Sequence, residues 1–150
     1  MVISNSAVLP GKLHCLIPLS PDKARVPFRQ INQSIAVTSL LRTTTSWDGT
    51  RYAGYPAGQP EITVLKITLS PHSLLPWHIH PVPSAVYILD GELTVENHIN
   101  GEKITLRKGS VMPDMVNRIH RGFTRDQHAS LIVFYAGSPG MILTQPVSCR

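Results

Sequence analysis

Two histidines separated by one residue in an extended segment, His78 and His80 in P-W-H-I-H-P, have the clearest chemical potential in this sequence. On a β-strand, side chains at i and i+2 point to the same face, so the two imidazoles would lie side by side. On a helix, residues on one face are three or four positions apart, so this spacing would separate them. A third imidazole from another strand, His120, would complete a three-nitrogen metal site with open coordination positions.

The elements around these histidines are predicted to be short β-strands. Strands are expected over residues 35–45, 61–70, 85–95, 103–107 and 131–135, where β-branched or apolar residues dominate. A change in the phase of the apolar positions after Val64 predicts a bulge in the second of these strands. Asn100-Gly101 predicts a two-residue hairpin turn. Without helical periodicity, short strands with regular turns favour an all-β fold of antiparallel strands, a sandwich or a barrel.

Composition argues against several classes of protein. A chain of 150 residues suits one domain with its own core, and no apolar run is long enough to span a membrane. The net charge of +5 is spread along the chain, without the basic stripe expected of a nucleic-acid-binding protein. The N-terminal segment lacks the pattern of a signal peptide, so we expect a cytoplasmic protein. Cys15 and Cys149 form either a disulfide or, as expected in that compartment, two free thiols.

The spacing of the histidines resembles the two motifs of the cupin superfamily, G-x5-H-x-H-x3,4-E-x6-G and G-x5-P-x-G-x2-H-x3-N. All three histidines fall where the family has histidine. The first motif corresponds to His72, His78, His80, Ser84 and Gly91, and the second to Gly109, Met115, Asn117, His120 and Thr124. The departures from the family pattern are His72 for Gly, Ser84 for Glu, Met115 for Pro, Asn117 for Gly and Thr124 for Asn.

More narrowly, T-T-S-W-D-G, H-P-V-P-S-x-x-Y-x-L-x-G-E-L and V-N-x-x-H-x-G…V-F-Y-A-G look like a branch of small single-domain cupins that commonly lacks the motif-one glutamate. The resemblance runs from about residue 40 to about residue 144. It implies a small jelly-roll (cupin) β-barrel of antiparallel strands over residues 35–145. Residues 1–34 are then an N-terminal extension or arm, and residues 146–150 a C-terminal tail.

The resemblance implies that His78, His80 and His120 bind a divalent transition metal, with Zn, Fe, Ni, Mn and Cu all compatible with imidazole ligands. Ser84 is a poor metal ligand, so the site would have three neutral nitrogens and no anionic ligand. Such an ion keeps its full charge and suits an anionic or enolate-like substrate. The alternative is that Ser84 is a small packing residue beside an empty site.

Four further residues are candidates for substrate binding or for support of the ligands. Asp114 can supply the missing carboxylate, but a solvated loop acid is the expected role. Asn117 either orients His120 or forms a turn. Arg118 shares strand parity with His120 and either clamps an anionic substrate in the cavity or lies in solvent at its mouth. Trp77 either lines the mouth of the barrel or packs.

The sequence thus predicts a cupin metalloprotein that binds a small molecule, acting as an oxidoreductase (dioxygenase-like) or an isomerase. The alternative is a non-catalytic small-ligand-binding module with an empty or incidental metal site. We expect a homodimer formed through paired or exchanged edge strands, because pairing protects strand edges from aggregation. The other histidines, residues 14, 72, 98 and 128, lack partners at ligand spacing and are expected to be exposed.

Overall fold

The computed structural model describes residues 35–148, and the domain that carries the site comprises residues 38–148 of these. The predictions about the N-terminal arm, His14, Cys15 and Cys149 lie outside the described residues. Between residues 35 and 148 there is no helix, and therefore none of the length and apolarity needed to cross a membrane.

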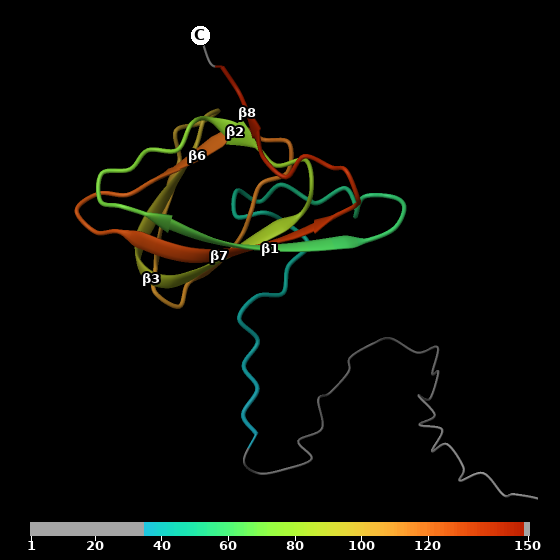
Figure 1. Cartoon of the computed structure of the whole chain (residues 1–150), viewed down its shortest axis with the longest axis horizontal. Helices are drawn as coiled ribbons and strands as arrows, with labels where there is room; N and C mark the ends of the chain where they lie inside the picture. Colours follow the sequence, from blue (N-terminus) through green and yellow to red (C-terminus); the bar gives the residue numbers. More distant parts are fainter. Residues whose placement is uncertain (1–34, 149–150) are drawn as a thin grey trace, which may run out of the picture. The chain divides into compact units, whose positions relative to one another are not determined.

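Eight strands form the fold, and every ladder between them is antiparallel (Figure 1). The strands are β1 (Glu61–Leu69), β2 (His78–Ile79), β3 (Ser84–Asn97), β4 (Lys103–Arg107), β5 (Val111–Pro113), β6 (His120–Phe123), β7 (Ala129–Gly137) and β8 (Gln145–Pro146). The predicted all-β jelly-roll barrel of antiparallel strands is confirmed.

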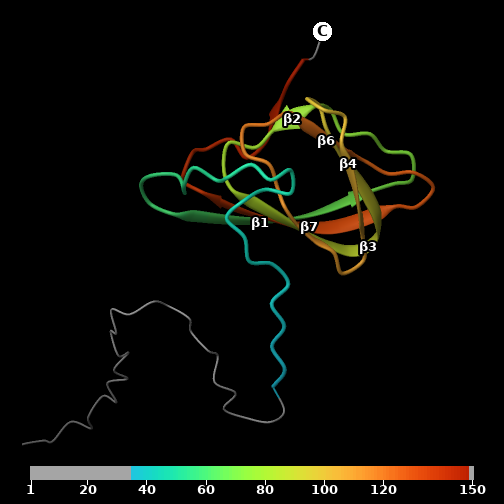
Figure 2. The same ribbon diagram turned by 180° about the vertical axis from the view of Figure 1, so that it is seen from behind.

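The long strand β3 joins two curved sheets. Its first half pairs with β7 and β5, and β7 in turn pairs with the edge strand β1. Its second half pairs with β4 and β6, and the ladder continues from β6 through β2 to β8. The two sheets face one another across the interior, with β1 and β7 below and β2, β6 and β8 above in Figure 1, and the arrangement is seen from behind in Figure 2.

Alternation along β3 and β7 places one set of side chains in the space between the sheets. Val86 and Val133 are each at most 4% exposed, whereas their neighbours along the strand are partly buried or exposed. The buried hydrophobic cluster consists of Leu69, Val82, Val86, Ile88, Leu93, Val95, Leu106, Met112, Ala129, Leu131, Val133 and Tyr135. The core therefore lies between the sheets, at the position where the site is also found.

The strand predicted over residues 35–45 is not formed. Residues 35–44 belong to no strand, and Thr45 makes only an isolated bridge to Arg51. Leu40 is 62% exposed, so its side chain does not cover the core. β-propensity reflects packing on a sheet surface, and these β-branched residues do not have one.

Two further predictions about the strands need correction. β1 pairs with β7 residue by residue without a bulge, and the bulge lies in β3 between Ile88 and Asp90. The chain reverses between β3 and β4 through the longer loop 98–102, so Asn100-Gly101 is not a two-residue hairpin. At the C-terminal end, β8 pairs with β2 and the Val147 N–H donates to the Trp77 carbonyl.

Gly91 lies next to the bulge, in a conformation and a space that only glycine fits. Its φ is +77°, and a Cβ there would lie 1.8 Å from the His128 carbonyl oxygen.

We predict that Gly91→Ala lowers the free energy of unfolding by on the order of 3 kcal/mol or more, because the backbone clash adds to the conformational cost. Gly101→Ala is the matched control, with a φ of +69° and no atom within 4 Å of the new Cβ. Its cost should be about 1 kcal/mol in urea unfolding, and equal costs for the two variants would contradict the role of the clash.

Candidate metal centre

The three histidines singled out by their spacing come together in the interior. His78 and His120 lie directly opposite each other in the β2–β6 ladder, and His80 follows on the same face two residues after His78. All three are buried, and their ligand atoms lie within 4.8 Å of one another. The ring centroids are 4.5 to 5.0 Å apart. The predicted convergence of the three imidazoles is therefore present.

The main chain determines which nitrogen of each ring faces the centre of the cluster. In each histidine, Nδ1 is within hydrogen-bonding distance of a backbone carbonyl oxygen. The partners are the oxygen of Pro76 for His78 at 2.7 Å, of Leu143 for His80 at 2.8 Å and of Arg118 for His120 at 2.8 Å. A carbonyl only accepts, so each Nδ1–H donates and Nε2 is left to bind a cation. This is the arrangement by which proteins orient metal-binding histidines.

A buried carboxylate completes the cluster, which corrects the expectation that Asp114 is a solvated loop acid. Asp114 is 3% exposed, and its Oδ2 and Oδ1 each lie 3.3 Å from an Nε2 atom, of His80 and His120 respectively. Its Oδ1 also accepts a hydrogen bond from the Met115 N–H at 2.8 Å. An anionic group therefore lies beside the three histidines, at the position that the sequence offered as an alternative source of the carboxylate. The Asp114 N–H donates to the Ser84 carbonyl, and this pairing turns the side chain inward.

The electrostatics of the cluster favour a cation at its centre. Burial alone would raise the pKa of Asp114, but the hydrogen bond to His80 and the charges of His120 and His80 hold it below its usual value. Burial lowers the pKa of His78 to about 4, so this ring is neutral at pH 7. Burial also acts to lower the pKa of His80, but the contacts with Asp114 outweigh it and raise that pKa. Carboxylate oxygens and imidazole Nε2 atoms both carry lone pairs, so their approach needs a proton or a metal ion between them.

An apolar cavity of about 200 Å³ adjoins the four polar residues. Its walls come from both sheets and include Ile67, Leu75, Val86, Leu93, Val95, Met112, Leu131 and Val133. Tyr135 also lines it and packs its ring edge against His80, at 5.5 Å between centroids. Burial raises the pKa of Tyr135, so its phenol is neutral and can donate a hydrogen bond. Among residues 35–148, no lysine or arginine lines this cavity.

The other predicted site residues lie outside the cavity. Arg118 is directed toward Asp48, with 3.4 Å between its Nε and Oδ2, and it does not clamp a ligand in the cavity. Asn117 is exposed with a φ of +55°, which is the turn-forming role. Trp77 packs: its ring centroid lies 4.7 Å from that of His98 and 4.1 Å from the Arg121 guanidinium carbon. Its side chain is not among those that line the cavity.

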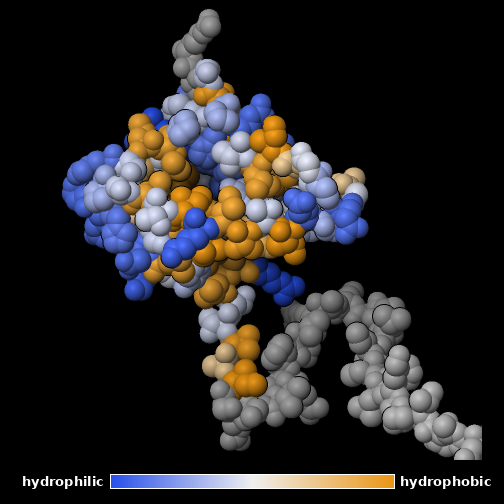
Figure 3. Space-filling model, viewed as in Figure 1, coloured by the Kyte–Doolittle hydropathy of each residue, from blue (hydrophilic) through white to orange (hydrophobic). Residues whose placement is uncertain are grey.

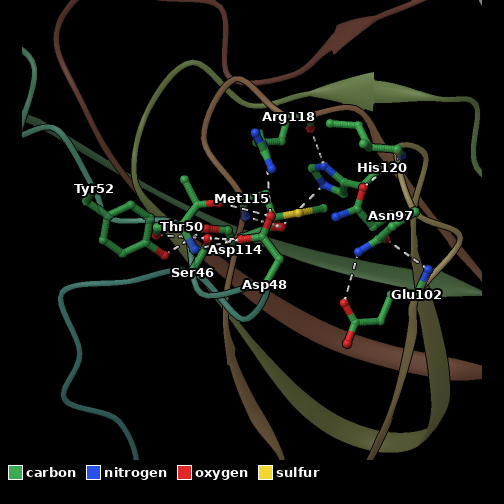
Figure 4. A network of polar contacts seen from close by, with 12 residues as sticks. Ser46, Asp48, Thr50, Tyr52, Asn97, Glu102, Asp114, Met115, Arg118 and His120 are labelled. Carbon is green, nitrogen blue, oxygen red and sulfur yellow. Dashed lines mark hydrogen bonds and ion pairs between the residues drawn. The ribbon is translucent and has the colours of Figure 1, made fainter.

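A loop that sequence analysis did not assign to the site, residues 44–52, fastens the segment that carries Asp114 (Figure 4). The Tyr52 hydroxyl donates to the Asp114 carbonyl at 2.7 Å, and the Trp47 N–H donates to the Pro113 carbonyl at 3.0 Å. Asp48 accepts from Ser46 and from the backbone and hydroxyl of Thr50, and it faces Arg118. The available signal was the S-W-D-G-T turn, in which an aspartate can accept a hydrogen bond from the backbone two residues on.

Comparisons with known proteins identify the fold. No protein-family model and no curated protein sequence matches the chain. A structure of DMSP lyases aligns with a TM-score of 0.52 and 16% identity, over 58% of this chain and 44% of that one. A cupin-like protein from Thermotoga maritima aligns with a TM-score of 0.51 and 17% identity, over 57% and 64%. The polyketide cyclase RemF from Streptomyces resistomycificus gives 0.51 and 17%, over 59% and 62%.

This chain thus matches about half to two thirds of the length of these structures, from 44% to 64%. At these identities the likeness concerns the fold, and it agrees with the resemblance found in the sequence. The domain has the cupin fold, a jelly-roll barrel of antiparallel strands. Its buried cluster of three histidines fits a metal-binding cupin.

The loop 44–52 leads to a prediction about acid stability. Burial acts to raise the pKa of Asp48, but hydrogen bonds from Ser46 and Thr50 and the charge of Arg118 outweigh it and lower that pKa below 3.8. The lowered pKa means that the folded state favours the ionised carboxylate, so its contribution is complete above about pH 4 and is lost as the pH falls further. We predict that Asp48→Asn destabilises the protein by about 1–3 kcal/mol at pH 7 and that the difference from the unmodified protein shrinks below pH 4.

Urea unfolding followed by the fluorescence of the two tryptophans at several pH values measures this difference. Asp126→Asn is the control, because the Asp126 side chain is 96% exposed and its replacement should have little effect at any pH. A gap between Asp48→Asn and the unmodified protein that stays constant down to pH 3 would contradict the assignment.

Proposed function

We propose that this protein is a metal-dependent cupin enzyme in which His78, His80 and His120 bind one divalent transition metal through their Nε2 atoms. The convergence of these three atoms beside an apolar cavity, with each Nδ1 held by a carbonyl, is the observation that carries the proposal. The three imidazole nitrogens suit a divalent transition metal, because neutral imidazole binds Zn, Fe, Ni, Mn and Cu. When bound, the ion supplies a Lewis acid that can polarise a substrate oxygen.

The reaction we propose is that of a small-molecule oxidoreductase (dioxygenase-like) or an isomerase. The apolar walls keep water away from the ligand and strengthen the electrostatic interactions at the polar end of the cavity. Tyr135, as a neutral phenol on the wall, is placed to donate a hydrogen bond to a bound molecule. Lyases and a polyketide cyclase occur among proteins of this fold, which is consistent with chemistry on small organic molecules.

The alternative is a non-catalytic module that binds a small ligand in the cavity, with no resident metal. A cavity with apolar walls and few polar groups favours this second candidate. The two differ in one measurable property, which is whether the protein as purified holds a metal ion on the three histidines.

We predict about one transition-metal ion per chain in protein purified without a chelator or a nickel column, measured by inductively coupled plasma mass spectrometry. His78→Ala and His120→Ala should each weaken metal binding by more than about a hundredfold, because losing even a residue that only orients a ligand costs 10- to 100-fold. His128→Ala is the control, since this histidine is half exposed and lies outside the cluster. A metal-free protein that still binds small apolar molecules would favour the binding module.

The cavity also restricts the class of substrate, and here the sequence-based proposal changes. An anionic substrate held by Arg118 is not supported, because Arg118 faces Asp48 and no cationic side chain lines the cavity. We propose a compact molecule with one oxygen end directed to the metal and an apolar body against the walls. A second charged group on that body would be buried without a partner.

Hexanoate and adipate test this substrate class as a matched pair, because they share a chain length and one carboxylate but adipate carries a second one. We predict that hexanoate binds the Co²⁺-loaded protein at least about tenfold more tightly, since burying an unpaired carboxylate costs several kcal/mol. Changes in the visible absorption of Co²⁺ measure binding. Equal or tighter binding of adipate would contradict an uncharged cavity wall without affecting the metal proposal.

A homodimer is the remaining part of the proposal. β1 is an edge strand, and Ile62 and Val64 on it are 68% and 57% exposed. Val64 lies opposite Phe134 of β7, which is 39% exposed, so the apolar surface continues across the ladder. Figure 3 shows apolar side chains gathered on this side of the domain. An exposed apolar edge of this kind is the surface that we propose pairs with a second copy.

A further inference from the structure

Asp114 and Ser84 lie directly across from each other on neighbouring segments. Ala85 pairs with Pro113 and Val86 with Met112 in the β3–β5 ladder, so the next pair in register is Ser84 with Asp114. The hydrogen bond from the Asp114 N–H to the Ser84 carbonyl, at 2.9 Å, continues this register. Residues opposite each other in an antiparallel pair project from the same face of the sheet. Both side chains are buried, 6% exposed for Ser84 and 3% for Asp114.

We infer that Asp114 is the anionic ligand of the metal centre and supplies the carboxylate from the position across the strand pair from Ser84. This inference rests on the proposed metal site. The two Asp114 oxygens already face the metal-binding nitrogens of His80 and His120, each at 3.3 Å. The carboxylate has no lysine or arginine partner among the described residues, so its burial needs compensation by a cation within the cluster.

The main chain around Asp114 is held on both sides, which directs the carboxylate toward the histidines. Its N–H is bonded to the Ser84 carbonyl, and its carbonyl accepts from the Tyr52 hydroxyl at 2.7 Å. Because the backbone cannot rotate freely, the carboxylate is oriented before any ion binds. A preoriented ligand loses less conformational freedom on binding and so contributes more to affinity.

Ser84 leaves room for this carboxylate. The sequence resemblance places a glutamate at position 84, and a glutamate there would face Asp114 across the pair, where like charges destabilise. Ser84 instead presents a small hydroxyl whose Oγ has no hydrogen-bond partner. The centre therefore combines three imidazole nitrogens with one carboxylate, with the acid moved from one strand to the next.

An exchange of the two side chains tests the inference. We expect Asp114→Ser to weaken Co²⁺ binding by roughly 10- to 100-fold, measured by competition with a chelator and by the visible absorption of Co²⁺. The double variant Ser84→Glu/Asp114→Ser, with the acid returned across the pair, should recover affinity to within about tenfold of the unmodified protein. Ser84→Glu alone should not tighten binding, because two acids then share one face.

Asp126→Ser is the matched control for loss of one negative charge, since the Asp126 side chain is 96% exposed. Asp114→Asn, with nearly the same shape, gives a second test if Asp114→Ser does not fold as judged by circular dichroism. Unchanged Co²⁺ affinity in a folded Asp114 variant overturns the inference, and so does a folded double variant as weak as Asp114→Ser. Unmodified protein that binds no metal contradicts the proposed function itself, whereas tight binding that is independent of Asp114 contradicts only this inference.

Discussion

The pairing of His78 with His120 across β2 and β6 is the contact on which the site depends. This ladder is very short, and the strands on either side of it hold its two members in place. β6 is held against the second half of β3, where Asn97 lies opposite His120, and β2 is held on its other side by β8. The fourteen residues of β3 run through both sheets, so the strand that forms the core also fixes the distance between the histidines.

Burial of this many polar groups is costly unless each atom has a partner. The three Nδ1 atoms are satisfied by backbone carbonyls, and Asp114 Oδ1 is satisfied in part by the Met115 N–H. The remaining Nε2 and carboxylate atoms face one another, and they are favourable neighbours only with positive charge between them. These atoms therefore attract a cation to one end of the apolar cavity, and the low dielectric there makes the attraction strong.

Local periodicity predicted much of the fold and part of the site. The strands β1, β3, β4 and β7, and the common face of His78 and His80, follow from patterns that each segment carries by itself. Residues 35–45 were mispredicted because β-branched composition indicates a strand only where a partner strand exists. The orientation of Arg118 was out of reach because strand parity applies only to extended strands, and β6 begins only at His120, after the turn at Asn117. The direction of Asp114 was also out of reach, since it depends on Ser84 and Tyr52, which are distant in sequence.

The position of the acid shows why the absence of a motif residue is weak evidence about a site. A sequence motif describes the residues of one strand, whereas the ligands of a metal ion can come from every strand of the enclosing sheets whose side chains reach it. Two residues opposite each other in an antiparallel ladder share a face and a depth, so a carboxylate can move between them while the donor set stays the same. Ser84 alone suggested an ion with its full charge, suited to anionic molecules. Asp114 lies beside the histidines, and no cationic side chain among the described residues lines the cavity. We therefore propose that the charge at the centre is partly balanced within the protein and that the apolar body of the ligand determines recognition.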